Sequence, residues 1–286
     1  TCFGHPHADS GFTLSSTDPA IRAFWIEHVR RCREISAVIG KTLGTPCVHN
    51  LWIPDGAKDT TVRRSLHRSL LRDALDTIFA KKYDADDIRD AVESKLFGIG
   101  SESFVVGSHE FYMGYAITRK LLICLDMGHF HPTESLADKI SSMLLFNDEL
   151  LLHVSRGVRW DSDHVVTLND DTTTLMEEIV RADALSRIRI ALDFFDASMN
   201  RIGAWVLGSR ATQKALLRAL LEPRAKLAAY EEDGNFFARM SLLEDLKAMP
   251  FGAVWDAHCA HAGVPTGEAL RTSIMDYERT VLSARG

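Results

Sequence analysis

Short apolar runs alternate along the chain with segments in which apolar residues recur at helical spacing. The first helical segment begins with Asp18 as N-cap and Pro19 at the first helical position, and we expect Gly40 to end it. Helical patterns also occupy residues 61–80, 109–120, 135–146 and 174–185. The apolar runs predict five strands, and CFGHPH (2–7) is counted as a further one. The five are TPCVHNLWIPDG (45–56), DAVESKLFG (90–98), LLICLD (121–126), ELLLHV (149–154) and RIRIALD (187–193).

This alternation of strands and helices predicts an α/β fold with a parallel sheet. The runs LLICL and ELLL are apolar apart from the leading Glu149, as expected of strands that are covered on both faces. A barrel and a doubly wound sheet both fit this order. From Ala211 onward the pattern is helical alone, so we expect an α/β domain over 1–210 that carries the site, and a helical extension over 211–286.

Composition and charge narrow the class of protein. The 286 residues carry a net charge of −6, with a pI near 6.0, which gives no basic surface for nucleic acid or for an anionic membrane. No apolar run reaches the roughly 18 residues of a membrane span. The five cysteines are scattered without a C-x-x-C pair, which argues against a disulfide framework. We therefore expect a cytoplasmic protein that acts on a small molecule.

The later strands each end in, or close to, a residue that can bind a metal ion. These residues are Glu93, Asp126, His153 and Asp193, spaced by about one strand–helix unit. In a parallel barrel the ends of successive strands lie side by side at one rim, so the four side chains would converge. Three carboxylates and an imidazole at one place would repel unless a cation lay among them. The pattern predicts a divalent metal site.

A second set of ligands adjoins the first. His129 follows Asp126 by three residues, and Asp161 and Asp163 are two apart, so that both carboxylates point to one side of an extended chain. With Asp126 shared, these residues would hold a second ion, and oxygen ligands with one histidine favour Mn²⁺, Mg²⁺ or Co²⁺. The alternatives are a solvated Asp-x-Asp loop and acids that cap the following helices.

Other residues near the strand ends have two interpretations each. Lys95 shares a strand face with Glu93, so it either hydrogen-bonds a substrate oxygen beside the metals or forms a structural ion pair. Trp52 either forms an apolar wall for substrate or belongs to the core. His131 either supports the metal-binding His129 or orients its own loop. The pair of histidines in HCAH (258–261) is interpreted as part of a surface helix.

Five motifs together resemble the L-rhamnose isomerase family, which belongs to the xylose-isomerase-like group of (β/α)8 barrels of the TIM type. The motifs are NLWIPDG, VESKLFGIGSES, LDMGHFHPTE, HVSRGVRWDSDH and ALDFFDASMNRIGAW, and the resemblance runs over nearly the whole chain. It implies that Glu93, Asp126, His153 and Asp193 hold a structural metal, and that His129, Asp161 and Asp163 hold the catalytic one. It also implies that Lys95 contacts the first oxygen of the sugar.

The activity implied by the resemblance is the interconversion of L-rhamnose and L-rhamnulose by a metal-assisted 1,2-hydride shift. Catalysis would involve Lys95, Asp126, His129, Asp161 and Asp163. Trp52 and Lys95 would bind the sugar. The implied cofactors are two Mn²⁺ ions per subunit, with Co²⁺, Mg²⁺ or Zn²⁺ as alternatives, and the implied assembly is a homotetramer.

The chain departs from this family in its number of strands. Six predicted strands cannot close an eight-stranded barrel, so we expect an incomplete barrel of about six strand–helix units that lacks the first units of the family. Two alternatives to the isomerase stay open. One is another metal-dependent sugar isomerase or epimerase of the TIM-barrel type, and the other is an inactive fragment.

Overall fold

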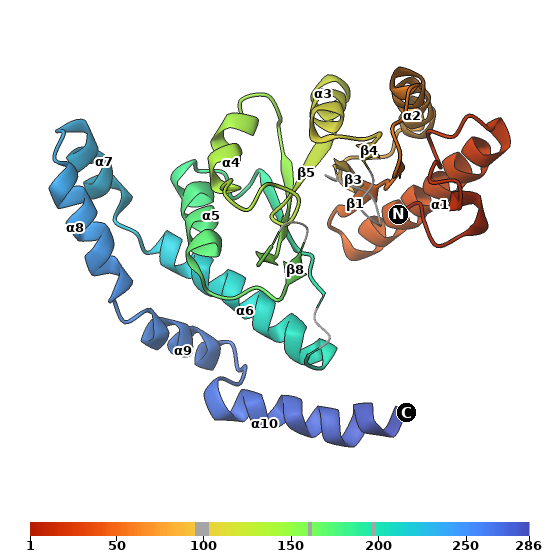
Figure 1. The fold of residues 1–286 in the computed structure, drawn as a ribbon. Helices are drawn as coiled ribbons and strands as arrows, with labels where there is room; N and C mark the ends of the chain where they lie inside the picture. The colour runs from red at the N-terminus through yellow and green to blue at the C-terminus, as the bar shows by residue number, and fades with distance from the viewer. Residues whose placement is uncertain (95–102, 160–161, 196–197, 286) are drawn as a thin grey trace. The chain divides into compact units, whose positions relative to one another are not determined.

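The computed structural model describes residues 1–94, 103–159, 162–195 and 198–285 (Figure 1). By its internal contacts the chain divides into two compact units. The first comprises Thr1–His153, Gly157–Ser162 and Arg187–Ala191, and the second comprises Val154–Arg156, Asp163–Ser186 and Leu192–Gly286.

A parallel sheet lies at the centre of the first unit. Its strands follow the order β1 (Cys47–Trp52), β3 (Ile88–Glu93), β5 (Leu122–Asp126), β6 (Leu150–Val154) and β9 (Ile188–Leu192). The pairs β1–β3, β3–β5 and β5–β6 are parallel. Each new strand is added beside the preceding one, which confirms the predicted α/β fold with a parallel sheet.

The connections between these strands are helical. They are α2 (Arg64–Phe79), α3 (His109–Arg119), α4 (Ala137–Met143) and α5 (Asp170–Arg181), with the short strands β2 (Gly56–Ala57), β4 (Phe104–Val105), β7 (Arg156–Gly157) and β8 (Asp163–His164) in the loops. β2 pairs with β4, and β7 pairs with β8.

One face of the sheet changes from apolar to polar along the strands. An apolar cluster on this face contains Ala91, Leu122, Cys124 and Leu151, with Val48 and Ala191 packed against it. Two residues further along β3, β5 and β6, the same face carries Glu93, Asp126 and His153. The sheet thus places its polar groups directly above a layer of apolar side chains.

The first helix, α1 (Pro19–Leu43), begins as predicted, because the Asp18 side chain accepts a hydrogen bond from the N–H of Ala20. Its predicted end at Gly40 is wrong. The helix continues to Leu43 and ends at Gly44, which has a left-handed backbone conformation (φ 68°). Gly40 is needed for packing instead, since a Cβ there would lie 1.8 Å from the carbonyl oxygen of Asp87.

The first predicted strand is also wrong. Residues 2–7 contain no strand, and Pro6–Ala8 form a short 3-10 helix, η1. Pro6 has no N–H for a sheet, and Gly4 has a positive φ of 73°, so neither residue favours an extended run. The other five predicted strands correspond to β1, β3, β5, β6 and β9.

A buried ion pair ties α1 to the sheet. Arg33 is only 2% exposed and donates two hydrogen bonds to the Asp90 carboxylate, at 2.9 and 2.7 Å. Its Nη1 group donates to the carbonyl oxygens of Ile78 and Lys81, at 2.7 and 3.0 Å. Burial acts to raise the pKa of Asp90, but hydrogen bonds from His49 and Arg33 hold it below its usual value.

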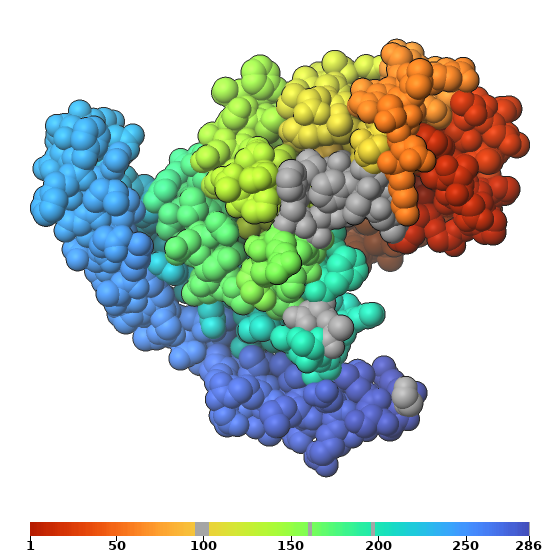
Figure 2. All heavy atoms as spheres, in the orientation of Figure 1, coloured from red at the N-terminus to blue at the C-terminus, as the bar shows by residue number. Residues whose placement is uncertain are grey.

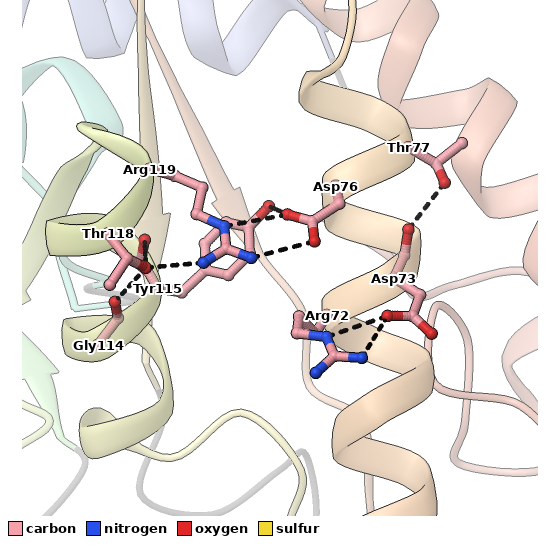
Figure 3. Close-up of polar contacts among 8 residues, drawn as sticks. All are labelled: Arg72, Asp73, Asp76, Thr77, Gly114, Tyr115, Thr118 and Arg119. Carbon is pink, nitrogen blue, oxygen red and sulfur yellow. Dashed lines mark hydrogen bonds and ion pairs between the residues drawn. The ribbon is translucent and has the colours of Figure 1, made fainter.

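The helices α2 and α3 lie side by side on the surface of the first unit (Figures 1 and 2). Figure 3 shows their polar contact, in which Asp76 accepts hydrogen bonds from the Tyr115 hydroxyl at 2.9 Å and from Arg119 at 3.1 and 3.2 Å. The Arg119 hydrogen bonds lower the pKa of Asp76. This contact is half-exposed, so it orients the two helices more than it stabilises them.

The second unit is mainly helical. Helix α5 packs against α6 (Arg201–Leu220), which is followed by α7 (Arg224–Glu232), α8 (Phe236–Lys247), α9 (Phe251–His261) and α10 (Gly267–Tyr277). A π-helical turn, Glu278–Leu282, and a 3-10 turn, Ser283–Arg285, complete the described chain.

Because α6 runs through residue 210, the predicted division at 210/211 falls inside a helix, and it stays a prediction. None of the helices among the described residues is both long and apolar enough to cross a membrane.

Candidate metal centre

Three of the predicted metal ligands meet at the carboxyl ends of neighbouring strands. Glu93 is the last residue of β3, Asp126 is the last residue of β5, and His153 is the residue paired with Asp126 on β6. Each offers one ligand atom, and these three atoms lie within 4.8 Å of one another. Glu93 and Asp126 are only 3% and 2% exposed, so the carboxylates are removed from solvent.

The His153 imidazole faces both carboxylates. Its Nδ1 lies 3.2 Å from Asp126 Oδ2 and 3.4 Å from Glu93 Oε1. The parallel ladder continues past the strand, because the Met127 N–H donates to the carbonyl oxygen of His153. Backbone pairing therefore fixes the spacing of these side chains.

His129 approaches the same carboxylates from the loop after β5. Its Nδ1 lies 2.9 Å from the carbonyl oxygen of Ser94 and 3.4 Å from Glu93 Oε1, and its Nε2 lies 3.9 Å from Asp126 Oδ2. A carbonyl oxygen can only accept a hydrogen bond, so Nδ1 carries the proton there. In a neutral imidazole, Nε2 is then the nitrogen with a lone pair for a metal ion.

The charges of this cluster are not balanced by a lysine or arginine among the described residues. The ion-pair partners of Glu93 and Asp126 there are His129 and His153. The ligand atoms of the two carboxylates lie within 4.8 Å of each other, and at such a separation two unit charges repel by roughly 3 kcal/mol at an effective dielectric constant of about 20. A divalent cation removes this repulsion, and carboxylate and imidazole groups are ligands that such ions accept. The residues present therefore fit a divalent metal.

Further groups orient the two carboxylates, and the sequence patterns did not reveal them. The Asn50 side chain on β1 donates a 2.5 Å hydrogen bond to Glu93 Oε2, and the Gly128 N–H donates a 2.7 Å bond to Asp126 Oδ1. Each carboxylate thus keeps one oxygen hydrogen-bonded to the protein while the other faces His153. Asn50 lies two residues before Trp52, so the alternation of the strand could have indicated that it shares this face.

Cys124 is a second residue that the sequence patterns did not reveal. Its sulfur lies within 4.8 Å of ligand atoms of Glu93 and His153. Burial, followed by the nearby charge of Glu93, raises the pKa of the Cys124 thiol. Cys124 precedes Asp126 by two residues and therefore points to the same face of β5.

The other predicted metal ligands and Lys95 do not belong to the described part of the first unit. Asp193 belongs to the second unit, directly after β9, and its N–H donates to the carbonyl oxygen of Val154. Asp163 belongs to the second unit too, where Ser155 donates its hydroxyl hydrogen bond at 3.2 Å. Lys95 and Asp161 lie outside the described residues. The roles of these four residues stay predictions.

Trp52 and His131 have contacts that bear on their two interpretations. Trp52 is half-buried at the end of β1, opposite Glu93, and the Phe3 ring meets it edge-on at 5.4 Å. His131 is exposed and its Nδ1 lies 2.7 Å from the Thr133 hydroxyl, a contact that orients its own loop. The HCAH motif ends helix α9, as predicted, although Cys259 within it is buried.

Known proteins resemble this chain over its whole length. The profile of the family described as L-rhamnose isomerase (RhaA) matches residues 1–285. An L-rhamnose isomerase of Rhodopirellula baltica is 54% identical over 283 residues, which are 99% of this chain and 66% of that protein. An L-rhamnose isomerase of Escherichia coli strain SE11 is 55% identical over 286 residues, 100% of this chain and 68% of that protein. The chain thus spans about two thirds of the length of these relatives.

Solved structures are more distant. A 3-keto-D-glucoside 4-epimerase of E. coli aligns with a TM-score of 0.44 and 11% identity, over 73% of this chain and 74% of that one. An L-ribulose 3-epimerase aligns with a TM-score of 0.42 and 13% identity, over 84% and 76%.

The family match and the sequence identities agree with the motifs that first suggested the relationship. The chain belongs to the L-rhamnose isomerase family.

Proposed function

We propose that the protein is a metal-dependent aldose–ketose isomerase that interconverts L-rhamnose and L-rhamnulose by a 1,2-hydride shift. The observation that carries this proposal is the buried cluster of Glu93, Asp126 and His153 at the strand ends of a chain that belongs to this family. The reaction moves a hydrogen between two carbons of one substrate, so it requires positioning and oxygen-charge stabilisation but no redox cofactor.

The first metal ion would be held by Glu93, Asp126 and His153, with Asp193 as the proposed fourth ligand. Asn50 and the Gly128 N–H hold the two carboxylates in one orientation, which keeps them preorganised for the ion. A bound divalent ion supplies Lewis-acid stabilisation of charge on the sugar oxygens. Mn²⁺ is the proposed ion, and Co²⁺, Mg²⁺ and Zn²⁺ are the alternatives.

We propose His129, Asp161 and Asp163 as the ligands of the second ion, with Asp126 shared. The hydrogen bond from His129 Nδ1 to the Ser94 carbonyl supports this role, because it sets the tautomer in which Nε2 can ligate. Lys95 would donate a hydrogen bond to the first oxygen of the sugar.

Trp52 is the proposed apolar wall of the sugar site. Its position at the end of β1, opposite Glu93, supports this role. An apolar wall excludes water from the reacting carbons, which keeps the electrostatic contacts of the site strong.

The wider architecture is part of the proposal. The sheet would form part of a (β/α)8 barrel, since its strands are added one beside the next around the order β1, β3, β5, β6 and β9. Residues 1–210 would form the barrel part and residues 211–286 the helical extension of a cytoplasmic homotetramer. Exposed apolar residues on α8 and α10, such as Phe237 and Met275, support an assembly through the extension.

A direct assay tests the activity. The chain is loaded with Mn²⁺ and incubated with L-rhamnose, and we expect L-rhamnulose to form. Formation of an epimeric aldose instead would favour the sugar epimerase alternative. If neither product forms although Mn²⁺ binds, the inactive alternative is favoured.

A variant tests the second ion. Asp161→Asn should abolish turnover while far-UV circular dichroism stays that of the parent chain. Asp170→Asn, at the exposed start of α5, is the matched control and should keep full activity. Full activity of the Asp161→Asn variant would contradict the assignment.

A further inference from the structure

The Cys124 thiol lies beside the proposed metal ligands, but it has no role in the function described above. It is on β5, 1% exposed, and it points to the same face as Asp126. Its sulfur and ligand atoms of Glu93 and His153 lie within 4.8 Å of one another. Three residues from three neighbouring strands thus bring a sulfur, an oxygen and a nitrogen together.

Two alternative ligand sets therefore share Glu93 and His153. One set adds Asp126 and presents oxygen and nitrogen atoms, and the other adds Cys124 and presents a sulfur. Cys124 belongs to the apolar layer with Ala91, Leu122 and Leu151, whereas Asp126 lies two residues further along β5 on the same face. An ion held by the second set would lie deeper in the sheet than an ion held by the first.

The two sets differ in the ions that they favour. Carboxylate oxygens suit hard ions such as Mn²⁺ and Mg²⁺, whereas thiolate sulfur suits zinc and other thiophilic ions. Packing alone does not require a thiol at this position, since an apolar side chain of similar size would fill the same layer. The neighbouring imidazole and carboxylate could bind the same metal ion as the sulfur.

We propose that Cys124, together with Glu93 and His153, forms a second position for a thiophilic divalent ion, which competes with the hard-metal position of the same centre. Binding of Cd²⁺ there forms a Cd–S bond and breaks the S–H bond, and the proton passes to the buffer. Because Glu93 and His153 are shared, the two positions cannot be filled together. This inference rests on the proposed metal centre and concerns which ions it accepts.

The experiment compares the parent chain with Cys124→Ser and Cys124→Val, and with Cys32→Ser as the matched control. Cys32 also lies beside an imidazole, with its sulfur 3.8 Å from His28 Nε2, but it is remote in sequence from the strand ends and belongs to α1. Far-UV circular dichroism and Mn²⁺ binding show whether each variant keeps the fold and the hard-metal position. The valine variant replaces the serine variant if a buried hydroxyl impairs folding.

Cd²⁺ is titrated into each chain while the ultraviolet absorption of a cadmium–thiolate bond and the displacement of Mn²⁺ are measured. We expect the parent chain and Cys32→Ser to show this absorption at one Cd²⁺ per chain as Mn²⁺ is displaced. In both Cys124 variants the absorption should be lost and the affinity for Cd²⁺ should fall by about 10- to 100-fold, with the Mn²⁺ affinity little changed.

Two results would overturn the inference in different ways. If Mn²⁺ binds the parent chain, but the Cd²⁺ affinity and absorption are the same with and without Cys124, the thiol is only a packing residue and the proposed centre stands. If the parent chain binds neither Mn²⁺ nor Cd²⁺, the proposed metal centre fails together with this inference.

Discussion

Substitution of Glu93 by Gln should have opposite effects on the metal-free and the metal-loaded protein. The change keeps the size of the side chain, and the amide oxygen can still accept the hydrogen bond that Asn50 donates to Glu93. It removes one of two buried negative charges whose ligand atoms lie within 4.8 Å of each other. The variant therefore tests the effect of the charge on stability without a change in side-chain size.

The expected change in the free energy of unfolding follows from the separation of the two charges. Two unit charges 4.8 Å apart repel by roughly 3 kcal/mol at an effective dielectric constant of about 20. Without metal, Glu93→Gln should raise the free energy of unfolding by about this amount. With Mn²⁺ at about 100 times its dissociation constant, the parent chain should gain about 2.7 kcal/mol, and the variant should lose most of that gain.

Urea unfolding with a chelator and with Mn²⁺ measures both effects, in a buffer of about pH 8 where imidazole groups are ordinarily neutral. Glu149→Gln is the matched control. Glu149 is paired with Arg89 and Arg189, so its neutralisation should slightly destabilise the chain and leave the effect of Mn²⁺ unchanged. A metal-free Glu93→Gln variant that is less stable than the parent, or that keeps the full stabilisation by Mn²⁺, would refute the reasoning.

Other changes test the scaffold that holds the site. Arg33→Ala should lower the free energy of unfolding by about 3–5 kcal/mol in urea, because the buried Asp90 carboxylate loses its guanidinium partner and keeps only His49. Arg31→Ala, at an exposed pair of the same helix, should cost under about 1 kcal/mol, and similar losses would contradict the role of burial. The lowered pKa of Asp90 contributes stability that is present above its unfolded pKa and is lost as the pH falls through the folded value. The free energy of unfolding of Asp90→Asn should therefore depend less steeply on pH in acid, and an unchanged slope would contradict the lowered pKa. Gly40→Ala should destabilise the protein by about 1–3 kcal/mol in thermal unfolding, since its Cβ would lie 1.8 Å from a backbone carbonyl oxygen. Gly114→Ala, whose Cβ would have nothing within 4 Å, should be neutral or stabilising. A Gly40→Ala variant as stable as the parent would disprove this close approach.

Much of the sheet follows from local pattern. LLICL and the three leucines after Glu149 are apolar runs, and they lie in β5 and β6 because a strand covered on both faces needs no alternation. The ends of these strands could be predicted as well, so Glu93, Asp126 and His153 were expected to meet. The convergence depends only on strand order, which the alternation with helices indicates.

The errors arise where a residue's role depends on distant contacts. Gly40 has the pattern of a helix end, but its conformation is helical, and the nearby Asp87 carbonyl is the reason for a glycine there. CFGHPH was predicted as a strand from its place in the alternation, although Gly4 and Pro6 disfavour one.

The supporting residues of the site were harder to predict for a similar reason. Asn50 and Cys124 each lie two residues before the end of their strand, where a cysteine is usually a core residue and an asparagine is usually exposed. Only the register between β1, β3 and β5 places Asn50 against Glu93 and Cys124 beside it.

The central claim is that Glu93, Asp126 and His153 are the ligands of one divalent ion. Anomalous diffraction at the manganese absorption edge, from crystals of the chain grown with Mn²⁺, tests it most directly. We predict a peak within coordination distance of all three side chains. A well-ordered cluster without a peak at saturating Mn²⁺, or a peak that contacts none of the three, would contradict it.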